Sequence, residues 1–315
     1  MSIIEDLDDA CIKSGFGNYS ISSHLLKYLY LLFDKFISFL TISSIFIAIA
    51  GFLLPCFSFL LYEVKVNFNL LLASSLLTFA VYNLNKLTDL KEDSVNVPER
   101  AGFIEKNKHS VIFAVVASYI AALSLSFLQN PFAIFIILFP FCTGIVYSIK
   151  ISNFRLKDIT GIKNIVVALP WAVIGTFLPL AVSFRDFIII LLIFYFVFTK
   201  LFINTVLFDV RDIEGDKINM VRTIPVTFGM KKTKNLLLVL NSTLIPWLAF
   251  SYLAGLFHQY LFVLIFTIVY GYWYILHFCK EGIKIGKSLD LLVDGEWIPV
   301  VILCLVMQFV LLPYS

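Results

Sequence analysis

Charged residues are scarce in this chain, and cysteines are few and scattered. Only 14% of the 315 residues are Asp, Glu, Lys or Arg, against about 25% in soluble domains. The formal net charge of +3 is too small to indicate a nucleic-acid partner. The five cysteines form no C-x-x-C pair, so neither a zinc site nor a disulfide framework is supported.

The first ten residues, MSIIEDLDDA, lack the basic region of a secretory signal peptide. We therefore expect residues 1–35 to remain as a cytoplasmic arm. Within it, HLLKYLYLLFDKF has apolar residues at helical spacing and could lie along the membrane surface. The remaining residues, 36–315, contain no linker or low-complexity tract and are expected to form one transmembrane domain.

Long apolar runs dominate the rest of the sequence. The chain is 60% hydrophobic, with a mean hydropathy of +0.93, and a membrane-spanning helix needs about 20 apolar residues. The composition and the apolar runs predict an all-α, polytopic membrane protein, a bundle of about nine transmembrane helices, and the paired motifs described below place these helices around a central cavity. The expected spans are 36–60, 67–84, 110–129, 131–148, 163–183, 186–207, 235–255, 259–278 and 297–313. The break at LQNPF, residues 128–132, is either a turn between two spans or a kink.

Basic residues are distributed unevenly between the expected loops. Of 24 Lys and Arg residues, 21 fall in the N-terminal arm and in the loops after the even-numbered spans. This bias places the N-terminus and those loops on the cytoplasmic side of the cell membrane. The loops after spans two and six are also the longest and most polar, which favours a functional role.

Each of these two long loops begins with a regular series of acidic or amide side chains. NLNKLTDLKED has its polar residues at i, i+4 and i+8, and DVRDIEGD has them at i, i+3 and i+7, so each series shares one helix face. The first motif comprises Asn85, Asp89 and Asp93, and the second comprises Asp209, Asp212 and Asp216.

Five converging aspartates would repel one another strongly unless cations were present. Two unit charges 4 Å apart repel by about 4 kcal/mol at an effective dielectric of about 20. Oxygen ligands of this kind suit magnesium, which is typically held by one or two carboxylates plus substrate phosphates. The alternative without a catalytic role is that each motif is a solvated helix end that stops translocation. Matching positions on matching spans favour a shared magnesium and diphosphate site.

Basic residues near the two motifs are candidates for contacting phosphate oxygens. Each is also explained by the cytoplasmic bias of Lys and Arg. These candidates are Arg100, Lys150, Arg155, Lys157, Lys163 and Arg222. Lys200 is different because it lies inside the sixth span, where a charge must face a cavity or a partner.

The sequence resembles the UbiA superfamily of intramembrane prenyltransferases. NKLTDLKED fits the family's N-x-x-x-D-x-x-x-D motif, and DVRDIEGDKINMVRTIPVTFG is similar to its second motif and the segment that follows. The intervening VYSIKISNFRLKDITGIKNIVVALPWAVIG is similar to the family's stretch of a Tyr, a Lys and a downstream Lys-Asn. The resemblance extends over residues 36–313.

This resemblance implies an enzyme that binds a polyprenyl diphosphate through two magnesium ions and passes the prenyl group to a lipophilic acceptor. By position, the implied metal ligands are Asn85, Asp89, Asp93, Asp212 and Asp216, with Asp209 a ligand or beside one. Arg100 and Lys150 would contact the diphosphate, and Tyr147 would face the allylic cation. Asp89, Asp93, Asp212, Asp216 and Tyr147 are thus the expected catalytic residues.

Three departures from the family pattern leave the acceptor open. Lys86 follows Asn85 where many quinone-pathway members have Asp, and Ala101 follows Arg100 where they have Pro. The Arg-Pro pair common near the first span is missing, and Lys35 is the nearest basic residue. An aromatic acid is therefore only one of several acceptors to consider, beside a glycerol-phosphate lipid and a polyene.

Two other functions remain as alternatives. A membrane terpene cyclase would use the same metal site without an acceptor, because the cation would attack its own double bonds. A secondary transporter would couple cation binding to transport, but its ion site is expected near the bilayer midplane, whereas these acids lie at one membrane face. We expect no nucleic acid and predict no protein partner.

Overall fold

The computed structural model describes residues 20–90, 93–94, 97–148, 160–218, 220–280, 282 and 285–311, with backbone alone at 20–27, 144–148 and 310–311. Helices and connecting turns account for these residues, and no strand occurs among them. The predicted all-α class is confirmed. The chain divides into two compact units, Met1–Thr41 and Ile42–Ser315.

The first unit contains most of helix α2, Ser20–Ile42. Its large apolar side chains are exposed in the protein alone: Tyr28, Leu29, Tyr30, Leu31, Leu32, Phe33, Phe36 and Phe39. A helix with so much exposed apolar surface is suited to a lipid environment. That α2 lies along the membrane surface stays a prediction.

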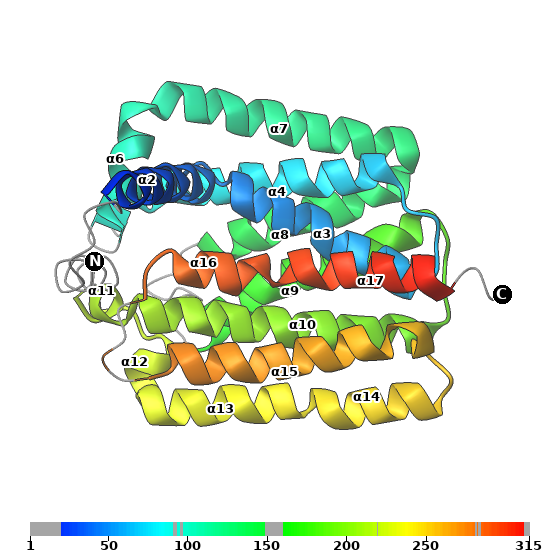
Figure 1. Ribbon diagram of the computed structural model, residues 1–315. Coiled ribbons are helices and arrows are strands. Elements are labelled where there is room, and N and C mark those ends of the chain that lie inside the picture. The colour runs from blue at the N-terminus through cyan, green and yellow to red at the C-terminus, as the bar shows by residue number, and fades with distance from the viewer. Residues whose placement is uncertain are drawn as a thin grey trace. The chain divides into compact units, whose positions relative to one another are not determined.

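The second unit is built from long helices that run side by side, with short helices at their ends (Figure 1). The N-terminal part comprises α3 (Ile45–Leu61), α4 (Phe68–Thr88), α6 (Pro98–Lys106), α7 (Lys108–Gln129), α8 (Pro131–Ser148), α9 (Ile162–Phe177) and η2 (Leu178–Ala181). The C-terminal part comprises α10 (Phe187–Arg211), α11 (Ile213–Ile218), α12 (Ile224–Phe228), α13 (Met230–Ser242), α14 (Leu244–Leu253), η3 (His258–Tyr260), α15 (Leu261–Phe278), α16 (Ser288–Leu292), η4 (Asp294–Glu296) and α17 (Trp297–Leu311).

In the part of the chain that the structure describes, helices lie in each of the nine predicted spans, but the count of nine membrane crossings is not confirmed. Among the described residues, six helical segments are long and apolar enough to cross a bilayer, or seven if a broken pair counts as one span. The expected continuous span 36–60 is wrong, because the helix breaks at Ser43–Ser44, where Ser44 has a φ of 64°. At LQNPF the chain turns: α7 ends at Gln129, and Asn130 Oδ1 accepts a hydrogen bond of 2.9 Å from the Phe132 amide.

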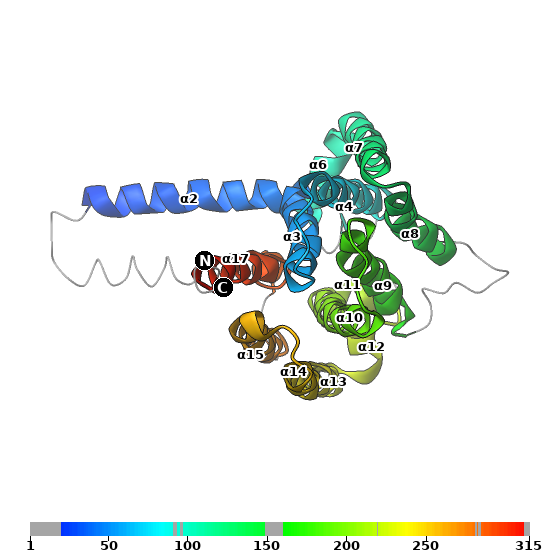
Figure 2. The same cartoon turned by 90° about the vertical axis from the view of Figure 1, so that its right-hand side faces the viewer.

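Helix α3 lies inside the second unit and packs against α4, α9 and α17 (Figure 2). Its contact with α4 is close: a Cβ on Gly51 would stand 2.1 Å from Thr78 Oγ1. Ser74 Oγ reinforces the contact by donating a hydrogen bond of 2.7 Å to the Gly51 carbonyl. Small residues and interhelical hydrogen bonds of this kind hold helices together in lipid. This packing fixes the helix that carries the first motif against the centre of the bundle.

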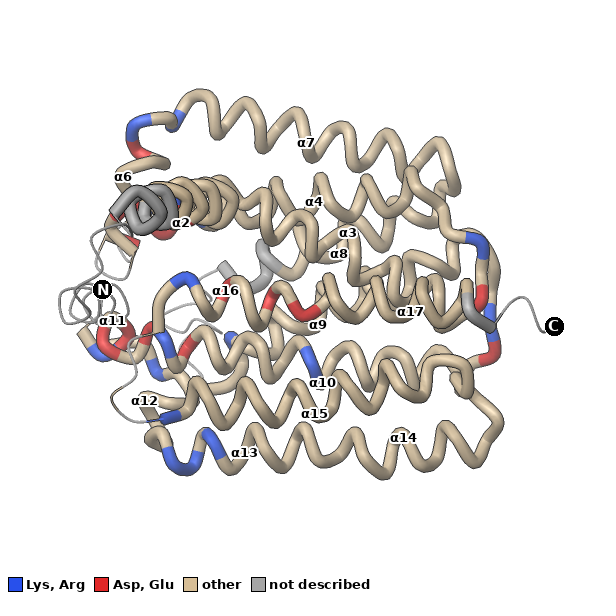
Figure 3. Tube along the Cα trace, in the orientation of Figure 1, with Lys and Arg blue, Asp and Glu red and all other residues tan. Residues whose placement is uncertain are grey.

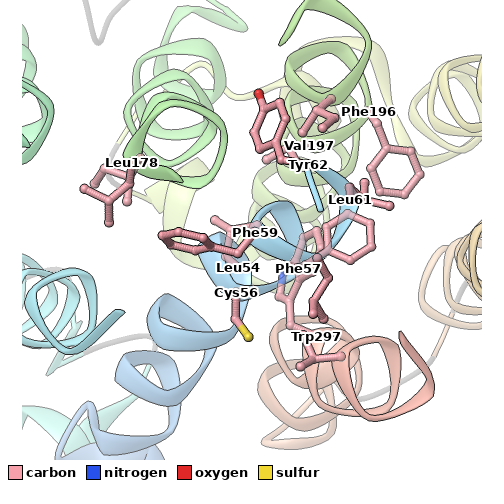
Figure 4. Packing of buried hydrophobic residues seen from close by; sticks show 14 of the residues in the cluster. Leu54, Cys56, Phe57, Phe59, Leu61, Tyr62, Leu178, Phe196, Val197 and Trp297 are labelled. Atoms are coloured by element: carbon pink, nitrogen blue, oxygen red, sulfur yellow. The ribbon is translucent and has the colours of Figure 1, made fainter. Parts of the chain in front are cut away.

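Aromatic side chains fill much of the core between α3, α10 and α17 (Figure 4). The Phe57 ring lies 5.6 Å from that of Phe196 and 5.5 Å from that of Trp297, measured between centroids. All three side chains are buried. The arrangement stabilises the contact between α10, which carries the second motif, and the start of α17.

Candidate active site

Both motifs lie at one end of the second unit, which also carries α6, α11, α12 and α16 and is here called the motif end (Figure 1). Charged residues gather at the motif end, whereas the long helices between the two ends contain few (Figure 3). The sequence predicted this clustering from the ends of the second and sixth spans. The two helices α4 and α10 deliver the motifs there.

The first motif follows the last turn of α4. Backbone hydrogen bonds of 2.9 Å run from the Asp89 amide to the Asn85 carbonyl and from the Asp93 amide to the Asp89 carbonyl. These i to i−4 bonds keep the three residues on one face, as predicted. Asn85 and Asp89 are exposed, while Asp93 is buried. Asp93 accepts two hydrogen bonds from the Arg100 guanidinium, one of them 2.9 Å from Nε.

The second motif begins inside α10 with Asp209, of which 2% is exposed. Both carboxylate oxygens of Asp209 are bonded by the first turn of α9: Lys163 Nζ lies 2.8 Å from Oδ1, and Asn164 Nδ2 donates to Oδ2 at 2.7 Å. A helix N-terminus favours a negative charge, so the dipole of α9 adds to these two bonds. Asp209 therefore joins α9 to α10 at the motif end.

Asp212 and Asp216 continue the second motif beyond α10. Arg211 donates two hydrogen bonds to the Asp212 carboxylate, of 2.8 and 3.1 Å. Asp216 is buried in α11, and its Oδ2 atom has no hydrogen-bond partner. Burial raises the pKa of Asp216 to about 6. The negative charges of Asp209 and Asp212 also raise this pKa, whereas the positive charge of Lys163 lowers it. The carboxylates of this motif are thus close enough to repel one another.

These side chains are donors of the kind that magnesium prefers, and their role as its ligands stays a prediction. The donors are hard carboxylate and amide oxygens, and the unpartnered oxygen of Asp216 lies where neighbouring negative charge calls for a cation. No three Asp, Glu, His or Cys side chains converge on a single metal position within the described ranges. Each ion would therefore take few carboxylates here, and the rest of its oxygens would come from substrate and water.

The predicted phosphate contacts have different outcomes. In this structure Arg100 and Lys163 are each paired with a motif carboxylate, and Arg222 is exposed. Lys150, Arg155 and Lys157 lie outside the described residues, as does the side chain of Tyr147. Their roles remain predictions. Arg100 is bonded to Asp93, and Lys163 is bonded to Asp209. A bound diphosphate would therefore have to share or displace these contacts.

The sequence reasoning missed two carboxylates in the segment SLDLLVDGEW, which precedes α17. Asp290 lies 3.5 Å from Arg211 Nη1, and Asp294 Oδ1 accepts a hydrogen bond of 2.8 Å from Asn204 Nδ2. Burial raises the pKa of Asp290, while Arg211, Arg100 and Lys86 act to lower it. Asp290 is therefore influenced by basic residues beside both motifs. The signal available in the sequence was a further pair of acids, four residues apart, next to a span.

A cavity lies between α3, α4, α9, α10 and the start of α17. Its volume is about 40 Å³. Apolar and aromatic residues line most of it, and Thr78, Asn204, Thr205 and Asp294 add polar groups. Tyr82 and Trp171 stack in its wall with ring centroids 5.7 Å apart. The predicted central cavity is therefore present between the helices that carry the motifs.

Lys200 has the partner that an intramembrane charge requires. Its Nζ lies 2.6 Å from Glu296 Oε1 and donates to the Thr267 carbonyl at 3.0 Å. Both charged side chains are almost fully buried. This ion pair connects α10 with η4, the turn that follows Asp290 and contains Asp294.

Lys86 is buried rather than directed to solvent. Its Nζ donates to the Ile42 carbonyl at 2.8 Å and to Ser44 Oγ at 2.7 Å. The ammonium therefore supports the break in the chain that precedes α3. Lys86, which stands where many quinone-pathway members have Asp, therefore has a structural role here.

Comparisons with known proteins agree with the sequence and the fold. A model of the UbiA prenyltransferase family matches residues 44–282. A digeranylgeranylglyceryl phosphate synthase from Sulfolobus acidocaldarius is 30% identical over 230 residues, which cover 70% of this chain and 78% of the relative. A synthase of the same name from Saccharolobus solfataricus is 28% identical over 226 residues, 70% of this chain and 77% of the relative.

Solved structures show the same fold. A UbiA homologue from Archaeoglobus fulgidus, bound to GPP and Mg²⁺, matches with a TM-score of 0.65 and 17% identity, covering 86% of this chain and 98% of its own. A structure of a digeranylgeranylglyceryl phosphate synthase matches with a TM-score of 0.55 and 17% identity, covering 85% and 94%. The extent of the family match, together with both motifs at one end of a helical membrane bundle, establishes that this chain belongs to the UbiA prenyltransferase family.

Proposed function

We propose that the protein transfers an isoprenyl group from a polyprenyl diphosphate to a lipophilic acceptor in a magnesium-dependent reaction that releases diphosphate. The observation that carries this proposal is the placement of two acidic motifs, each with basic partners, at one end of a bundle with a cavity between its helices. An acidic, oxygen-rich end suits a metal-bound diphosphate, and the apolar lining of the cavity suits the reacting end of a prenyl group.

We assign the metal-binding role to the two motifs. Asn85, Asp89 and Asp93 would hold one ion, and Asp212 and Asp216 a second, with Asp209 a ligand or beside one. Bound magnesium would neutralise charge on the departing diphosphate. Arg100 and Lys163 are near enough to motif carboxylates to exchange those partners for phosphate oxygens. The structures of related proteins with Mg²⁺ and GPP or DMAPP support the choice of metal and donor.

The cavity wall is suited to the reaction that follows loss of diphosphate. The faces of Tyr82 and Trp171 would stabilise positive charge on the allylic carbon, because aromatic faces attract cations. Exclusion of water from this apolar space would protect the cation from hydrolysis. Tyr147 retains its predicted place near the cation as a part of this proposal.

A glyceryl phosphate lipid is the acceptor that we favour. Both curated relatives described above are named for a glyceryl phosphate with two geranylgeranyl groups. Formation of such a product fits transfer of a prenyl group to a hydroxyl of a glyceryl phosphate that carries one prenyl chain already. The replacement of the quinone-pathway pattern by Lys86 and Ala101 is consistent with this acceptor class.

We further propose that the motif end faces the cytoplasm of a multi-pass protein in the cell membrane. The bias of Lys and Arg toward the loops at this end supports that orientation. Helix α2, with its exposed aromatic and aliphatic side chains, would lie along the membrane surface.

The proposal is tested by incubating the purified protein with magnesium and geranylgeranyl diphosphate, with and without a mono-prenylated glyceryl phosphate, followed by mass spectrometry. We expect a doubly prenylated product and diphosphate, both lost when EDTA removes magnesium. A cyclic hydrocarbon formed without acceptor would show that the protein is a terpene cyclase instead. Inertness toward prenyl diphosphates of every length would contradict both enzyme functions.

A further inference from the structure

Asp294 is the carboxylate that reaches the central cavity. Among the lining residues it is the one acid, and it stands there with Tyr82 of α4 and Asn204 of α10. Only 8% of Asp294 is exposed, and its Oδ1 is held at 2.8 Å by Asn204 Nδ2. The side chain therefore belongs to a built polar site inside an otherwise apolar wall.

The place of Asp294 relative to the motifs is fixed by its neighbours on α10 and α4. Asn204 precedes Asp209 by five residues, which corresponds to about 7.5 Å along the helix axis. Tyr82 precedes Asn85 by three residues, or about 4.5 Å. A diphosphate held between the motifs would thus have its allylic carbon directed toward the level of Asp294.

The turn that carries Asp294 is held tightly on both sides. Glu296 forms the buried ion pair of 2.6 Å with Lys200 of α10. A Cβ on Gly295 would stand 3.0 Å from the Phe46 ring of α3, so the turn packs closely against that helix. These contacts keep the Asp294 carboxylate in place while a substrate enters the cavity.

We propose that the Asp294 carboxylate is a catalytic base that accepts the proton lost by the acceptor's hydroxyl group during prenyl transfer. In this step a bond forms between the hydroxyl oxygen and the allylic carbon. The bond from that carbon to the diphosphate oxygen breaks, and its electron pair leaves with diphosphate. The hydroxyl proton passes to Asp294. The inference rests on the proposed function, and it specifies an acceptor that reacts through a hydroxyl group.

The electrostatic surroundings agree with such a role. Burial and the nearby Asp290 raise the pKa of Asp294 to about 7, while the Asn204 hydrogen bond and Arg211 oppose the rise. A base whose pKa lies near the working pH is well matched to proton transfer. The charged groups that act on the Asp294 carboxyl are Asp290 of α16 and Arg211 of α10, and Asp294 in turn acts on Tyr82 of α4.

Asp294→Asn provides the direct test, because the amide keeps an oxygen for Asn204 but cannot take the proton at neutral pH. We expect transfer to the mono-prenylated glyceryl phosphate to fall by about 10²–10³-fold. Magnesium-dependent binding of geranylgeranyl diphosphate should stay within about twofold, because the motifs are intact. The wild-type rate should rise with pH to a plateau, and the variant should lose that rise. Asp186→Asn, at the exposed N-cap of α10, is the control with unchanged activity.

Asn204→Ala gives a second test that keeps the carboxylate. Loss of the donor should raise the pKa of Asp294 further, so the rising part of the pH profile should move to higher pH. An unmoved profile would overturn the inference, as would transfer by Asp294→Asn within about threefold of wild type. Parallel loss of transfer and of prenyl diphosphate binding would also overturn it, by showing a structural role. Inert wild-type protein would instead refute the proposed function itself.

Discussion

The two acidic motifs occupy the same end of the bundle, yet they are held in different ways. In the first, Asn85 and Asp89 are exposed, and Asp93 alone is buried, against Arg100. In the second, Asp209 is buried and bonded by Lys163 and Asn164. The second motif is thus tied into the packing of α9 and α10, whereas the first remains open at the end of α4. Contacts between helices thus hold Asp209 of the second motif, whereas two residues of the first motif are exposed.

Because of this difference, substitutions in the two motifs should affect enzyme activity and protein stability to different extents. Asn85 and Asp89, the exposed residues of the first motif, can serve the substrate with little effect on the fold, whereas Asp93 is buried against Arg100. Asp209 supports both the site and the fold, because its removal would leave a buried amide without its partner.

Asp89→Ala and Asp212→Ala should each reduce turnover by at least about 10³-fold, because each removes a proposed metal ligand. The mutants are measured by diphosphate release in the presence of saturating magnesium. Glu214→Ala is the matched control, since Glu214 is an exposed acid within the second motif's segment. Activity near the wild-type level in either Asp variant would show that the motifs do not hold the metal.

Asp209→Ala should lower stability more than Asp89→Ala does. Loss of the Asp209 carboxylate leaves the buried Asn164 amide and the Lys163 ammonium without their bonds, at a cost of about 1–3 kcal/mol. Asp89 is exposed, and its removal should change the free energy of unfolding by less than about 0.5 kcal/mol. Thermal unfolding in detergent measures both. Equal unfolding temperatures for the two variants would refute the contrast between the motifs.

Arg100→Lys and Arg211→Lys should each lower catalytic efficiency by about tenfold. Each Arg makes two hydrogen bonds to one motif carboxylate, which a Lys ammonium cannot reproduce in the same plane. Steady-state kinetics with varied prenyl diphosphate checks this. An effect confined to Arg211 would mean that only the second motif depends on its arginine.

Magnesium affinity should weaken at acidic pH because of Asp216. The pKa of Asp216 is raised to about 6, so between about pH 4 and 6 the metal-free fold holds a proton that an ordinary Asp would have lost. A metal ion must displace that proton, so affinity falls as the pH drops through 6. At pH 5.5 the apparent dissociation constant should be about fourfold higher than at pH 7.5. Asp216→Asn should abolish this pH dependence, and its persistence would assign it to another group.

Much of this site was predictable from the sequence, because apolar runs and helical spacing are local properties. The ends of α4 and α10 follow from hydropathy, and the shared face of Asn85, Asp89 and Asp93 follows from their spacing. Neither property could predict that Lys163 and Asn164 would bond Asp209, because that contact joins two helices 45 residues apart.

The errors have physical causes as well. The first span was predicted as continuous because no Gly or Pro marks the break, yet Ser44 adopts a left-handed conformation supported by a hydrogen bond from Lys86. The predicted spans leave Asp290 and Asp294 in a loop, although tertiary packing buries Asp294 in a cavity wall. Burial of a polar side chain between distant helices leaves little trace in a single sequence.

Equilibrium binding tests whether the first and second motifs together hold one metal-bound diphosphate. The ligand is an unreactive geranylgeranyl diphosphate analogue with sulfur in place of the bridging oxygen, titrated with and without magnesium. We predict tight binding to the wild type only with magnesium, and a loss of affinity of at least about 100-fold in both Asp89→Ala and Asp212→Ala. Binding like that of the wild type in either variant, or binding unaffected by magnesium, would show that the two motifs do not hold the diphosphate together through a metal ion.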